Sequence, residues 1–292
     1  MKIAVLADIH SNYVALEECL SYAFSHHADT FFFLGDYVGE LAYPERTMEI
    51  LYGLQSKYKC YFIRGNKEEY WLNYRKNGEK GWKDKDSTSG MLLYAYNNLT
   101  SEDLDFYEEM PIAMEVNVQG LPPVTICHGS PEKVNEKLLP GNERTEAVMD
   151  NSNTDVIISG HTHIQGKILH NGRCVLNPGS VGVSFLSGGK AQFMFLCGEE
   201  GRWQEEFVSL DYDREKVLCQ MQEERLYEHA PCWARITERI IRGEAVTHGR
   251  VLNKAMALCL EDTGDCSWPN IPEKYFEEAL QSFGIEVGGK GL

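Results

Sequence analysis

Short apolar runs recur along the first two thirds of the chain, and each one stops where polar side chains begin. The runs are rich in the β-branched and aromatic residues that favour β-strands. Segments with the apolar spacing of helices lie between them. Alternating strands and helices are typical of an α/β fold with parallel strands. The five runs and the residues that follow them are KIAVL before Asp8 and His10, TFFFL before Asp36, KCYFI before Asn66, PPVTI before His128, and DVIIS before His161 and His163.

Two helix starts can be placed from their capping residues. A helix is predicted over residues 13–26, directly after Ser11 and Asn12. A second helix is predicted to begin after Thr100, where Asp103 completes a capping box. We therefore expect helices packed beside the strands in this part of the chain.

The chain between the third and fourth runs is polar, and the chain after the fifth becomes apolar again. Residues 67–90 are rich in Lys, Gly, Asp and Ser, so we expect a solvated excursion with an exposed charged face. The segments AQFMFLC (191–197) and WQEEFVSL (203–210) are predicted to be two closing strands that form a second, antiparallel element.

The residues after about 211 have a different pattern, with apolar positions at helical spacing. We therefore divide the chain into an α/β domain at residues 1–211 and a helical C-terminal extension at residues 212–292. Aromatic residues of the extension, such as Trp233, are expected in a core or an interface. The glycine-rich final residues are expected to be disordered. Prolines at predicted helix starts and glycines at predicted helix ends are Pro231, Pro272, Gly243, Gly264 and Gly284.

Composition allows a well-packed globular protein and argues against several classes of partner. With 292 residues, 43% of them hydrophobic, the chain can build a sizeable core without disulfides. Its formal charge of −16 repels nucleic-acid backbones and anionic membranes, so we expect neither as a partner. Nine cysteines without Cys-x-x-Cys spacing suit a reducing interior. The sequence has no signal-peptide pattern and no run of about 18 apolar residues, so we expect a cytoplasmic protein.

The polar residues after the five runs are all able to bind a metal ion. In open α/β sheets the ligand crevice lies beyond the carboxyl ends of the strands, so these residues can meet there. Carboxylate, imidazole and amide oxygen without thiolate suit Mn, Fe, Zn, Co or Ni. Seven ligands are too many for one such ion, and they fit two ions about 3.5–4 Å apart that share a carboxylate. The seven candidate metal ligands are Asp8, His10, Asp36, Asn66, His128, His161 and His163.

His161 and His163 are separated by one residue in the stretch Gly-His-Thr-His. On an extended chain, residues two apart point to the same side, so both rings can face the crevice. We expect the two imidazoles to reach different ions. The five other histidines, His248 among them, have no motif around them and are expected on the surface or in helices.

The chain contains six motifs that resemble, in their order, those of the calcineurin-like metallophosphoesterase superfamily: ADIHSN, LGDYVG, RGNKE, ICHGSP, SGHTH and LNPGSVG. The resemblance spans residues 1 to about 200. It is closest to the small bacterial and archaeal branch of phosphodiesterases and dinucleoside-polyphosphatase-like proteins. It implies a fold of class α/β, a four-layer α/β/β/α sandwich, to which the helical C-terminal extension is added.

The resemblance also implies a role for each candidate ligand. Asp36 would bridge the ions and, with Asn66 and His128, take part in catalysis. A water or hydroxide between the ions would attack phosphorus opposite the leaving group, because metal binding can lower the pKa of water from 15.7 to about 7. One ion would be surrounded by Asp8, His10, Asp36 and His163, and the other by Asp36, Asn66, His128 and His161.

Three further residues are candidate substrate contacts. Asn12 could touch phosphate or cap the helix that follows it, and Arg64 could add a secondary contact to the phosphoryl oxygens. Lys67 stands where many members of the superfamily have a histidine that resembles a general acid. A lysine with a pKa near 10.4 is a poor proton donor, so it either holds phosphate as a fixed charge or faces solvent. We therefore expect substrates whose leaving groups have a low pKa.

The expected activity is hydrolysis of a small phosphodiester or a nucleotide-like phosphoanhydride. The expected cofactor is a pair of divalent, or mixed-valence, transition-metal ions, and the sequence does not distinguish Mn, Fe, Zn and Ni.

Two alternatives stay open, a protein serine/threonine phosphatase and a non-catalytic scaffold that keeps the fold as an interaction surface. The complete ligand set argues against the scaffold, and the acidic composition argues against acidic phosphopeptides. The helical extension could bind a partner, form a homo-oligomer or cover the crevice.

Overall fold

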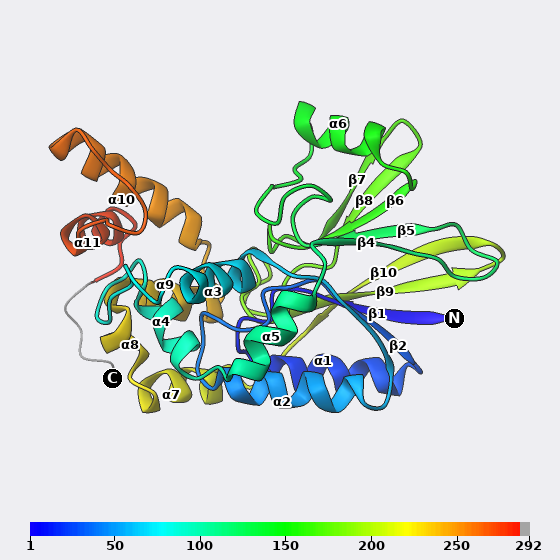
Figure 1. The fold of residues 1–292 in the computed structure, drawn as a ribbon, viewed down its shortest axis with the longest axis horizontal. Helices are drawn as coiled ribbons and strands as arrows, with labels where there is room; N and C mark the ends of the chain where they lie inside the picture. Colours follow the sequence, from blue (N-terminus) through cyan, green and yellow to red (C-terminus); the bar gives the residue numbers. More distant parts are fainter. Residues whose placement is uncertain (287–292) are drawn as a thin grey trace.

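The computed structural model describes residues 1–286 and is built around two β-sheets of five strands each (Figure 1). In order across the first sheet, the strands are β10 (Arg202–Leu210), β9 (Ala191–Glu199), β1 (Lys2–Leu6), β2 (Thr30–Phe33) and β3 (Lys59–Phe62). Across the second sheet they are β4 (Ala113–Val116), β5 (Val124–Cys127), β6 (Val156–Ser159), β8 (Arg173–Asn177) and β7 (Gly166–His170).

Parallel strands form the middle of the fold, and antiparallel strands complete its sheets. β1, β2 and β3 run parallel in the first sheet, as do β5, β6 and β8 in the second. The two closing strands predicted after residue 190 are β9 and β10, and they pair antiparallel with each other. They do not form a separate element, because β9 also pairs with β1 and so extends the first sheet.

The apolar run of β1 divides between two hydrophobic cores. Side chains alternate along a strand, so Ile3 and Val5 enter the core between the sheets. Ala4 and Leu6 enter the core on the other face of the same sheet, where helices cover it. Because both faces are buried, the strand is a continuous apolar run and shows no polar alternation.

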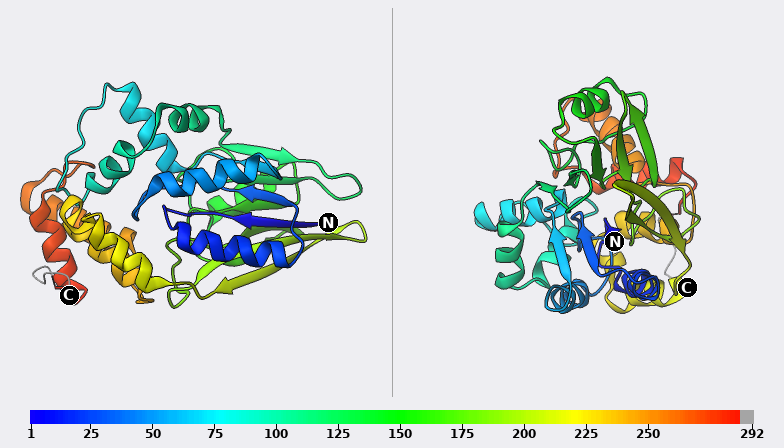
Figure 2. Two further views of the ribbon diagram at one scale, coloured as in Figure 1. Left: turned by 90° about the horizontal axis from the view of Figure 1, so that it is seen from below. Right: turned by 90° about the vertical axis from the view of Figure 1, so that its right-hand side faces the viewer.

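Helices cover the outer faces of the two sheets. Figures 1 and 2 show α1 and α2 along the outside of the first sheet and α6 along the outside of the second. The order helix, sheet, sheet, helix confirms the predicted four-layer α/β/β/α sandwich. The covering helices are α1 (Tyr13–Ser25), α2 (Pro44–Gln55), α5 (Ser101–Glu109) and α6 (Glu143–Asn151).

Both predicted helix starts are confirmed. The side chain of Asn12 accepts a hydrogen bond from the backbone N–H of Ala15, three residues into α1, at 3.1 Å. At the start of α5, Thr100 and Asp103 form the reciprocal capping box, in which each side chain bonds the other residue's backbone N–H.

The prediction of a solvated excursion at residues 67–90 is wrong at both ends of that segment. It begins inside α3 (Asn66–Lys76) and ends at α4 (Gly90–Asn97). Trp71 is fully buried in the core outside the first sheet, and its indole N–H donates to the carbonyl of Leu92 in α4. The high charge of the segment concealed the few apolar positions that anchor these helices.

The C-terminal part of the chain is helical, as predicted. Pro231 is the first residue of α9, and Gly264 ends α10 with a φ of +72° that suits glycine. Residues 287–292, the glycine-rich end expected to be disordered, lie outside the described residues. The helices are α7 (Arg214–Glu223), α8 (Leu226–His229), α9 (Pro231–Ile241), α10 (His248–Thr263) and α11 (Glu273–Ser282).

These helices pack onto the sandwich at the end where its parallel strands finish. Figure 1 shows α7 to α11 at the end of the molecule opposite the N-terminus, beyond the carboxyl ends of β1 and β2. Tyr13, Leu41 and Met91 of the sandwich share one hydrophobic core with Met221 and Ile236 of the helices. Within residues 1–286, no helix has the length and apolar character needed to cross a membrane.

Candidate metal centre

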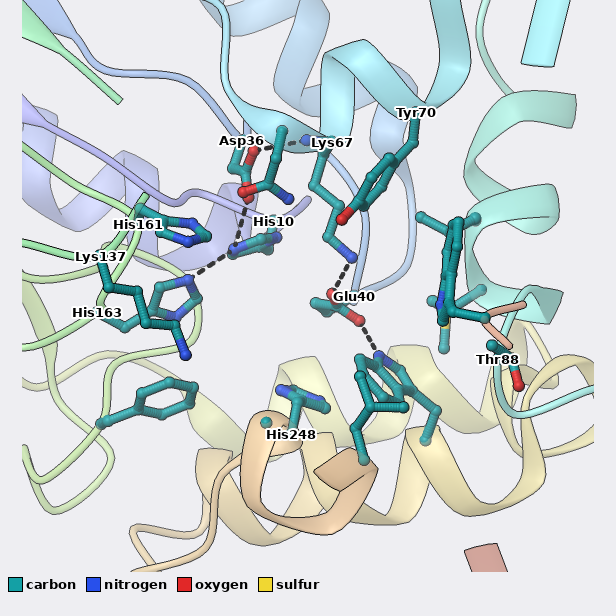
Figure 3. A pocket seen from close by; sticks show the side chains of 18 residues that line it. His10, Asp36, Glu40, Lys67, Tyr70, Thr88, Lys137, His161, His163 and His248 are labelled. Carbon is teal, nitrogen blue, oxygen red and sulfur yellow. Dashed lines mark hydrogen bonds and ion pairs between the residues drawn. The ribbon is translucent and has the colours of Figure 1, made fainter. Parts of the chain in front are cut away.

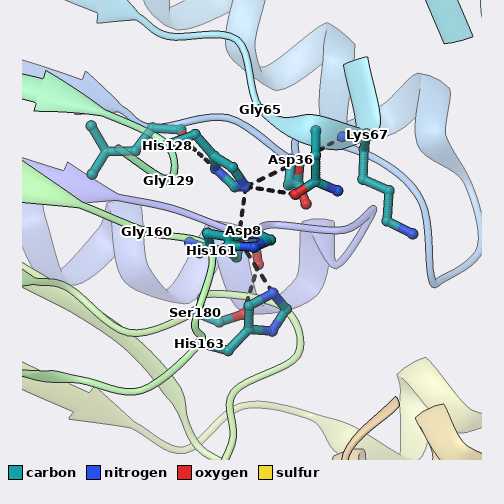
Figure 4. A network of polar contacts seen from close by, with 12 residues as sticks. Asp8, Asp36, Gly65, Lys67, His128, Gly129, Gly160, His161, His163 and Ser180 are labelled. Carbon is teal, nitrogen blue, oxygen red and sulfur yellow. Dashed lines mark hydrogen bonds and ion pairs between the residues drawn. The ribbon is translucent and has the colours of Figure 1, made fainter. Parts of the chain in front are cut away.

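The seven candidate ligands lie together, on segments that follow five parallel strands. Figure 4 shows five of them: Asp8, Asp36, His128, His161 and His163. Three of these strands belong to the first sheet and two to the second, so the centre joins the sheets at one end. Six of the side chains are buried, and that of His161 is half-buried. Asp8 and His10 follow β1, Asp36 follows β2, Asn66 begins α3 after β3, His128 follows β5, and His161 and His163 follow β6.

The backbone at this centre is strained. Positive φ is uncommon outside glycine and persists only where the surroundings enforce it. In the first loops, the N–H of Asp8 donates to the carbonyl of Gly35 at 3.1 Å, and the N–H of His10 donates to that of Asp36 at 3.0 Å. Five of the seven residues have a positive φ: Asp8 at 54°, His10 at 49°, Asp36 at 54°, His161 at 64° and His163 at 56°.

Asp8, His10 and His163 form one group of potential ligands. Nε2 of His10 lies 3.1 Å from Nε2 of His163. Oδ1 of Asp8 lies 3.3 Å from Nε2 of His163 and 4.0 Å from Nε2 of His10. Three potential donor atoms therefore surround one small space.

Asp8, Asp36 and His128 form a second group, which shares Asp8 with the first. Nε2 of His128 lies 3.4 Å from Oδ1 of Asp36 and 3.9 Å from Oδ1 of Asp8. Oδ1 of Asn66 lies 3.2 Å from the same nitrogen. The ring of His161 lies 5.2 Å from that of His128, centre to centre. Both carboxylates thus lie between the two sets of imidazoles.

The protonation of two histidines fits metal binding. Nδ1 of His128 bonds the carbonyl of Leu34, and Nδ1 of His163 bonds the carbonyl of Val183, both at 2.6 Å. A carbonyl only accepts, so Nδ1 carries the proton and the lone pair of Nε2 points into the centre. Oδ1 of Asp8 faces one of these lone pairs and has no hydrogen-bond partner in the described part of the chain. A cation would satisfy both atoms, so the donor set fits divalent metal ions.

The charges of the two aspartates oppose each other without a cation. Burial and the nearby Asp8 carboxylate raise the pKa of Asp36 above its ordinary value. Burial also raises the pKa of Asp8, but the surrounding imidazoles, His163 foremost, lower it below its ordinary value. Burial and the His128 charge lower the pKa of His161 to about 3, which keeps that ligand neutral at pH 7. Divalent ions would remove the conflict between the carboxylates and stabilise both as anions.

Residues 1–199 match the family model of the calcineurin-like phosphoesterase superfamily domain. The chain belongs to this superfamily. It is therefore a metal-dependent phosphoesterase, in agreement with the buried aspartates and histidines that could hold divalent metal ions.

Three relatives of this phosphoesterase illustrate how far the similarity extends. An uncharacterized protein of Methanocaldococcus jannaschii is 29% identical over 244 residues, covering 77% of this chain and 94% of that protein. The crystal structure of a hypothetical protein from Pyrococcus horikoshii OT3 has a TM-score of 0.69 at 20% identity, covering 84% and 99% of the two chains. The crystal structure of a metallophosphoesterase from Sphaerobacter thermophilus has a TM-score of 0.65 at 22% identity, covering 84% of this chain and 100% of that one. The two structures share the fold, and their coverage reaches beyond β10 into the C-terminal helices.

Glu68 connects two segments of the metal centre, and it is not among the residues predicted for the site. The side chain is fully buried and accepts hydrogen bonds from the backbone N–H groups of Asp36, Tyr37 and Gly65, at 2.7–2.9 Å. Burial and the nearby Asp36 charge raise its pKa to about 7. It thereby ties the loop after β2 to the start of α3. The signal in the sequence was a glutamate three residues after Gly65, the spacing at which a carboxylate can accept from the N–H of the residue that caps a helix.

Lys67 does not face solvent, so that interpretation is wrong. Its side chain is 11% exposed, and Nζ forms an ion pair with Glu40 (Figure 3). The other carboxylate oxygen of Glu40 accepts a hydrogen bond from the indole N–H of Trp233 in α9. Burial raises the pKa of Glu40, but the Lys67 charge, nearby His248 and the hydrogen bonds from Lys67 and Trp233 together outweigh burial and lower the pKa to about 2. A chain of polar contacts therefore connects the metal centre to the C-terminal helices.

Asn12 and Arg64, two candidate substrate contacts, lie elsewhere. Asn12 caps α1, and its Nδ2 donates to the carbonyl of Gly182 at 2.9 Å, so its polar groups have partners within the fold. Arg64 lies beside Glu69 and Glu108, where it borders a separate hollow. Among the described residues, neither lines the pocket at the metal centre.

A pocket of about 230 Å³ lies beside the metal centre and has two different sides (Figure 3). Figure 3 shows Lys67 and Lys137 reaching toward it from different directions. The side at the metal centre is formed by His10, Asp36, Asn66, His161 and His163. The opposite side is formed largely by Met91 of α4, Trp233 of α9, His248 and Leu252 of α10, and Trp268 after α10.

His248 and Trp233 are pocket residues that the sequence analysis assigned elsewhere. His248 lies in a helix, one of the two positions expected for it, but it is not at the surface. It is buried at the first turn of α10 and stacks on Trp233 with ring centres 4.5 Å apart. Its Nε2 lies 2.8 Å from the hydroxyl of Thr237. Burial lowers the pKa of His248 to about 4, so the ring is neutral at pH 7. No local motif marks either residue.

Proposed function

We propose that the protein is a dinuclear metal-dependent phosphoesterase that hydrolyses a small phosphodiester or nucleotide-like phosphoanhydride. The main support is that two groups of buried ligands meet at the carboxylates of Asp8 and Asp36, with an orphaned oxygen of Asp8 between them. Two ions that share a carboxylate suit in-line displacement at phosphorus.

Each of the two metal positions has its own set of residues in this proposal. Asp36 lies between the sets, since its Oδ2 is 3.8 Å from Nε2 of His10 and its Oδ1 is 3.4 Å from Nε2 of His128. Bound ions would lower the pKa of water and offset charge on the phosphoryl oxygens, and Mn, Fe, Zn and Ni all suit such ligands. Asp8, His10, Asp36 and His163 would hold one ion, and Asp36, Asn66, His128 and His161 the other.

Lys67 is proposed to hold a phosphoryl oxygen as a fixed positive charge. Burial alone would lower its pKa, but Glu40 and Asp36 raise it above its ordinary value, so the ammonium keeps its proton. His248, the other basic group on that side, is neutral at pH 7. Neither group protonates a leaving group readily, which favours substrates with leaving groups of low pKa.

The size of the pocket supports a small substrate. A volume of about 230 Å³ is small for a ligand site, and helices α9 and α10 close one side of it. A phosphorylated protein segment would need an open groove, so the protein serine/threonine phosphatase is the weaker alternative. In this proposal, residues 1–211 are the catalytic domain and residues 212–292 the helical extension that covers its crevice.

A matrix of metals against substrates tests the proposal, with Asp36→Asn as the blank. The wild-type protein, loaded in turn with Mn, Fe, Zn or Ni, should hydrolyse activated phosphodiesters and bind two metal equivalents. Asp36→Asn should lose more than about 100-fold in rate, since even residues that only support metal ligands cost 10–100-fold. Undiminished hydrolysis by Asp36→Asn, or a single metal equivalent in fully active protein, would contradict the dinuclear centre.

A further inference from the structure

The pocket wall opposite the metal centre is apolar and aromatic, which a site for phosphate alone does not need. Four residues define this wall, from four different parts of the chain: Tyr70 of α3, Met91 of α4, Leu252 of α10 and Trp268 in the loop before α11. We propose that this wall is a subsite for a flat unsaturated ring carried by the phosphoester substrate. The inference rests on the proposed function and adds a substrate class to it, a phosphoester of a nucleoside or of a simple aryl alcohol.

The aromatic pair of the wall is open to a ligand. The Trp268 side chain is 40% exposed although it lines the pocket. Its ring lies 5.2 Å from that of Tyr70, with 33° between the planes. Aromatic faces bind flat rings through stacking, whatever the ring's hydrogen-bonding pattern. A ring that enters beside this pair would cover apolar surface that is otherwise exposed to water.

The other two residues of the wall, Met91 and Leu252, are aliphatic. Met91 is almost fully buried in α4, and Leu252 is half-buried on α10. Ligand pockets combine such surfaces with a few polar groups that fix the orientation of the ligand. Here the polar groups are Lys67, Lys137 and the metal ligands, so the phosphate and the ring of the substrate would occupy opposite ends.

The dimensions of the pocket limit the substrate to a phosphate and a compact ring system. At about 230 Å³ the space is too small for a peptide segment, which is a further reason to expect a small ester. Leu252 and Trp268 lie outside residues 1–199, the part of the chain that matches the superfamily model. Selectivity for the ring would therefore depend in part on residues after the sandwich, whereas all the metal ligands come from the sandwich.

Calorimetric titration with phosphonates, which are not hydrolysed, tests the subsite separately from catalysis. Methylphosphonate, phenylphosphonate and the methylenephosphonate analogue of AMP are titrated into the Mn-loaded protein. Phenylphosphonate should bind about 10-fold more tightly than methylphosphonate, the gain expected for stacking one ring. Tighter binding of the AMP analogue than of phenylphosphonate would identify a nucleobase as the ring. Equal affinities for the AMP analogue and phenylphosphonate would identify a simple aryl group. Both outcomes support the subsite.

Two substitutions connect the gain in affinity to the wall. Leu252→Ala and Trp268→Ala should bring the ratio of the two dissociation constants close to one, while methylphosphonate binding stays unchanged. Leu260→Ala is the matched control, because Leu260 lies on the same helix, is 55% exposed and does not line the pocket. Trp268→Leu keeps apolar volume but removes the ring face, and it should lose most of the gain.

The outcomes separate the subsite from the proposed function. Equal affinity of the wild-type protein for methylphosphonate and phenylphosphonate would overturn the subsite, even with full phosphodiesterase activity. A ratio that survives both wall substitutions would overturn it as well. Absence of turnover with every metal and substrate, together with a ratio that depends on the wall, would overturn the proposed function and leave the subsite standing.

Discussion

The metal centre and the aromatic wall share one pocket but are built in opposite ways. The centre consists of polar side chains on loops, each oriented by hydrogen bonds such as that from His163 to the carbonyl of Val183. The wall consists of apolar and aromatic side chains, three on helices and Trp268 on a loop, and Met91 and Leu252 are positioned by packing in a hydrophobic core. A polar contact is lost when an atom moves by about 1 Å, whereas apolar burial changes in proportion to area. Changes in the centre should therefore reduce the rate steeply, and changes in the wall should alter affinity gradually.

The largest effect is expected from Asp8→Asn, because Asp8 belongs to both groups of ligands. We expect kcat/KM to fall more than about 100-fold and the ion held by Asp8, His10, Asp36 and His163 to be lost, since supporting residues alone cost 10–100-fold. Metal analysis of the purified variant, together with its rate on an activated phosphodiester, checks both expectations. A variant that keeps two ions and the wild-type rate would contradict the role of Asp8 as a metal ligand.

Glu40→Gln tests the polar contacts that connect Lys67, beside the metal centre, with Trp233 of the C-terminal helices. Without the carboxylate, the buried Lys67 ammonium loses its charged partner, and we expect kcat to fall about 10-fold with metal content unchanged. Glu205→Gln is a matched control, because Glu205 pairs with Lys167 at 2.8 Å in a more exposed position far from the pocket. An equal effect of the two substitutions would show that the Lys67 pair has no special role.

The same pair gives the metal-free protein a pH dependence of stability. The pKa of Glu40 is about 2 in the folded protein and 4.5 ordinarily, so its stabilising contribution is full above pH 4.5 and declines as the pH falls toward 2. The advantage of the wild type over Glu40→Gln in unfolding free energy should therefore shrink by about 2 kcal/mol between pH 5 and pH 3. Urea unfolding in chelator measures it, and a constant difference would contradict the low pKa.

Trp233→Phe should have a smaller effect than Glu40→Gln. It removes the N–H that donates to Glu40 but keeps a ring that can stack on His248. We expect kcat to fall about threefold, which corresponds to one hydrogen bond of roughly 0.7 kcal/mol. Steady-state kinetics beside Glu40→Gln ranks the two substitutions, and a larger loss for Trp233→Phe would reverse their order of importance.

The smallest effect is expected from Arg64→Ala. Arg64 contacts Glu69 and the carbonyl of Glu108 and borders a different hollow. We expect kcat and KM to stay within about twofold of the wild type, as for most surface substitutions. A 10-fold rise in KM would place this arginine at the substrate after all.

Much of the centre could be predicted because its information is local. Asp8, Asp36 and His128 each follow an apolar run directly, and parallel strands of a sheet end on the same side. Residue type and position relative to a strand therefore indicated which side chains could meet. The runs indicated an α/β fold, the family resemblance implied its four-layer order, and the structure confirms both.

The supporting and covering residues could not be predicted in the same way. Glu68 lies in a segment whose high charge suggests solvent, and its burial depends on backbone N–H groups from another loop. Glu40, Trp233 and His248 are far apart in the sequence, and no spacing rule connects an acid after β2 with the starts of two helices. Their contact depends on how the helices pack on the sandwich.

The sequence by itself determined which side chains can bind metal and at which strand ends they stand. It did so because strand formation, loop position and ligand chemistry are properties of a few neighbouring residues. Only the tertiary structure decided that Lys67 is paired and buried, that His248 lines the pocket, and that the C-terminal helices form one side of that pocket. These features depend on contacts between segments many residues apart, and such contacts arise from packing that no local pattern records.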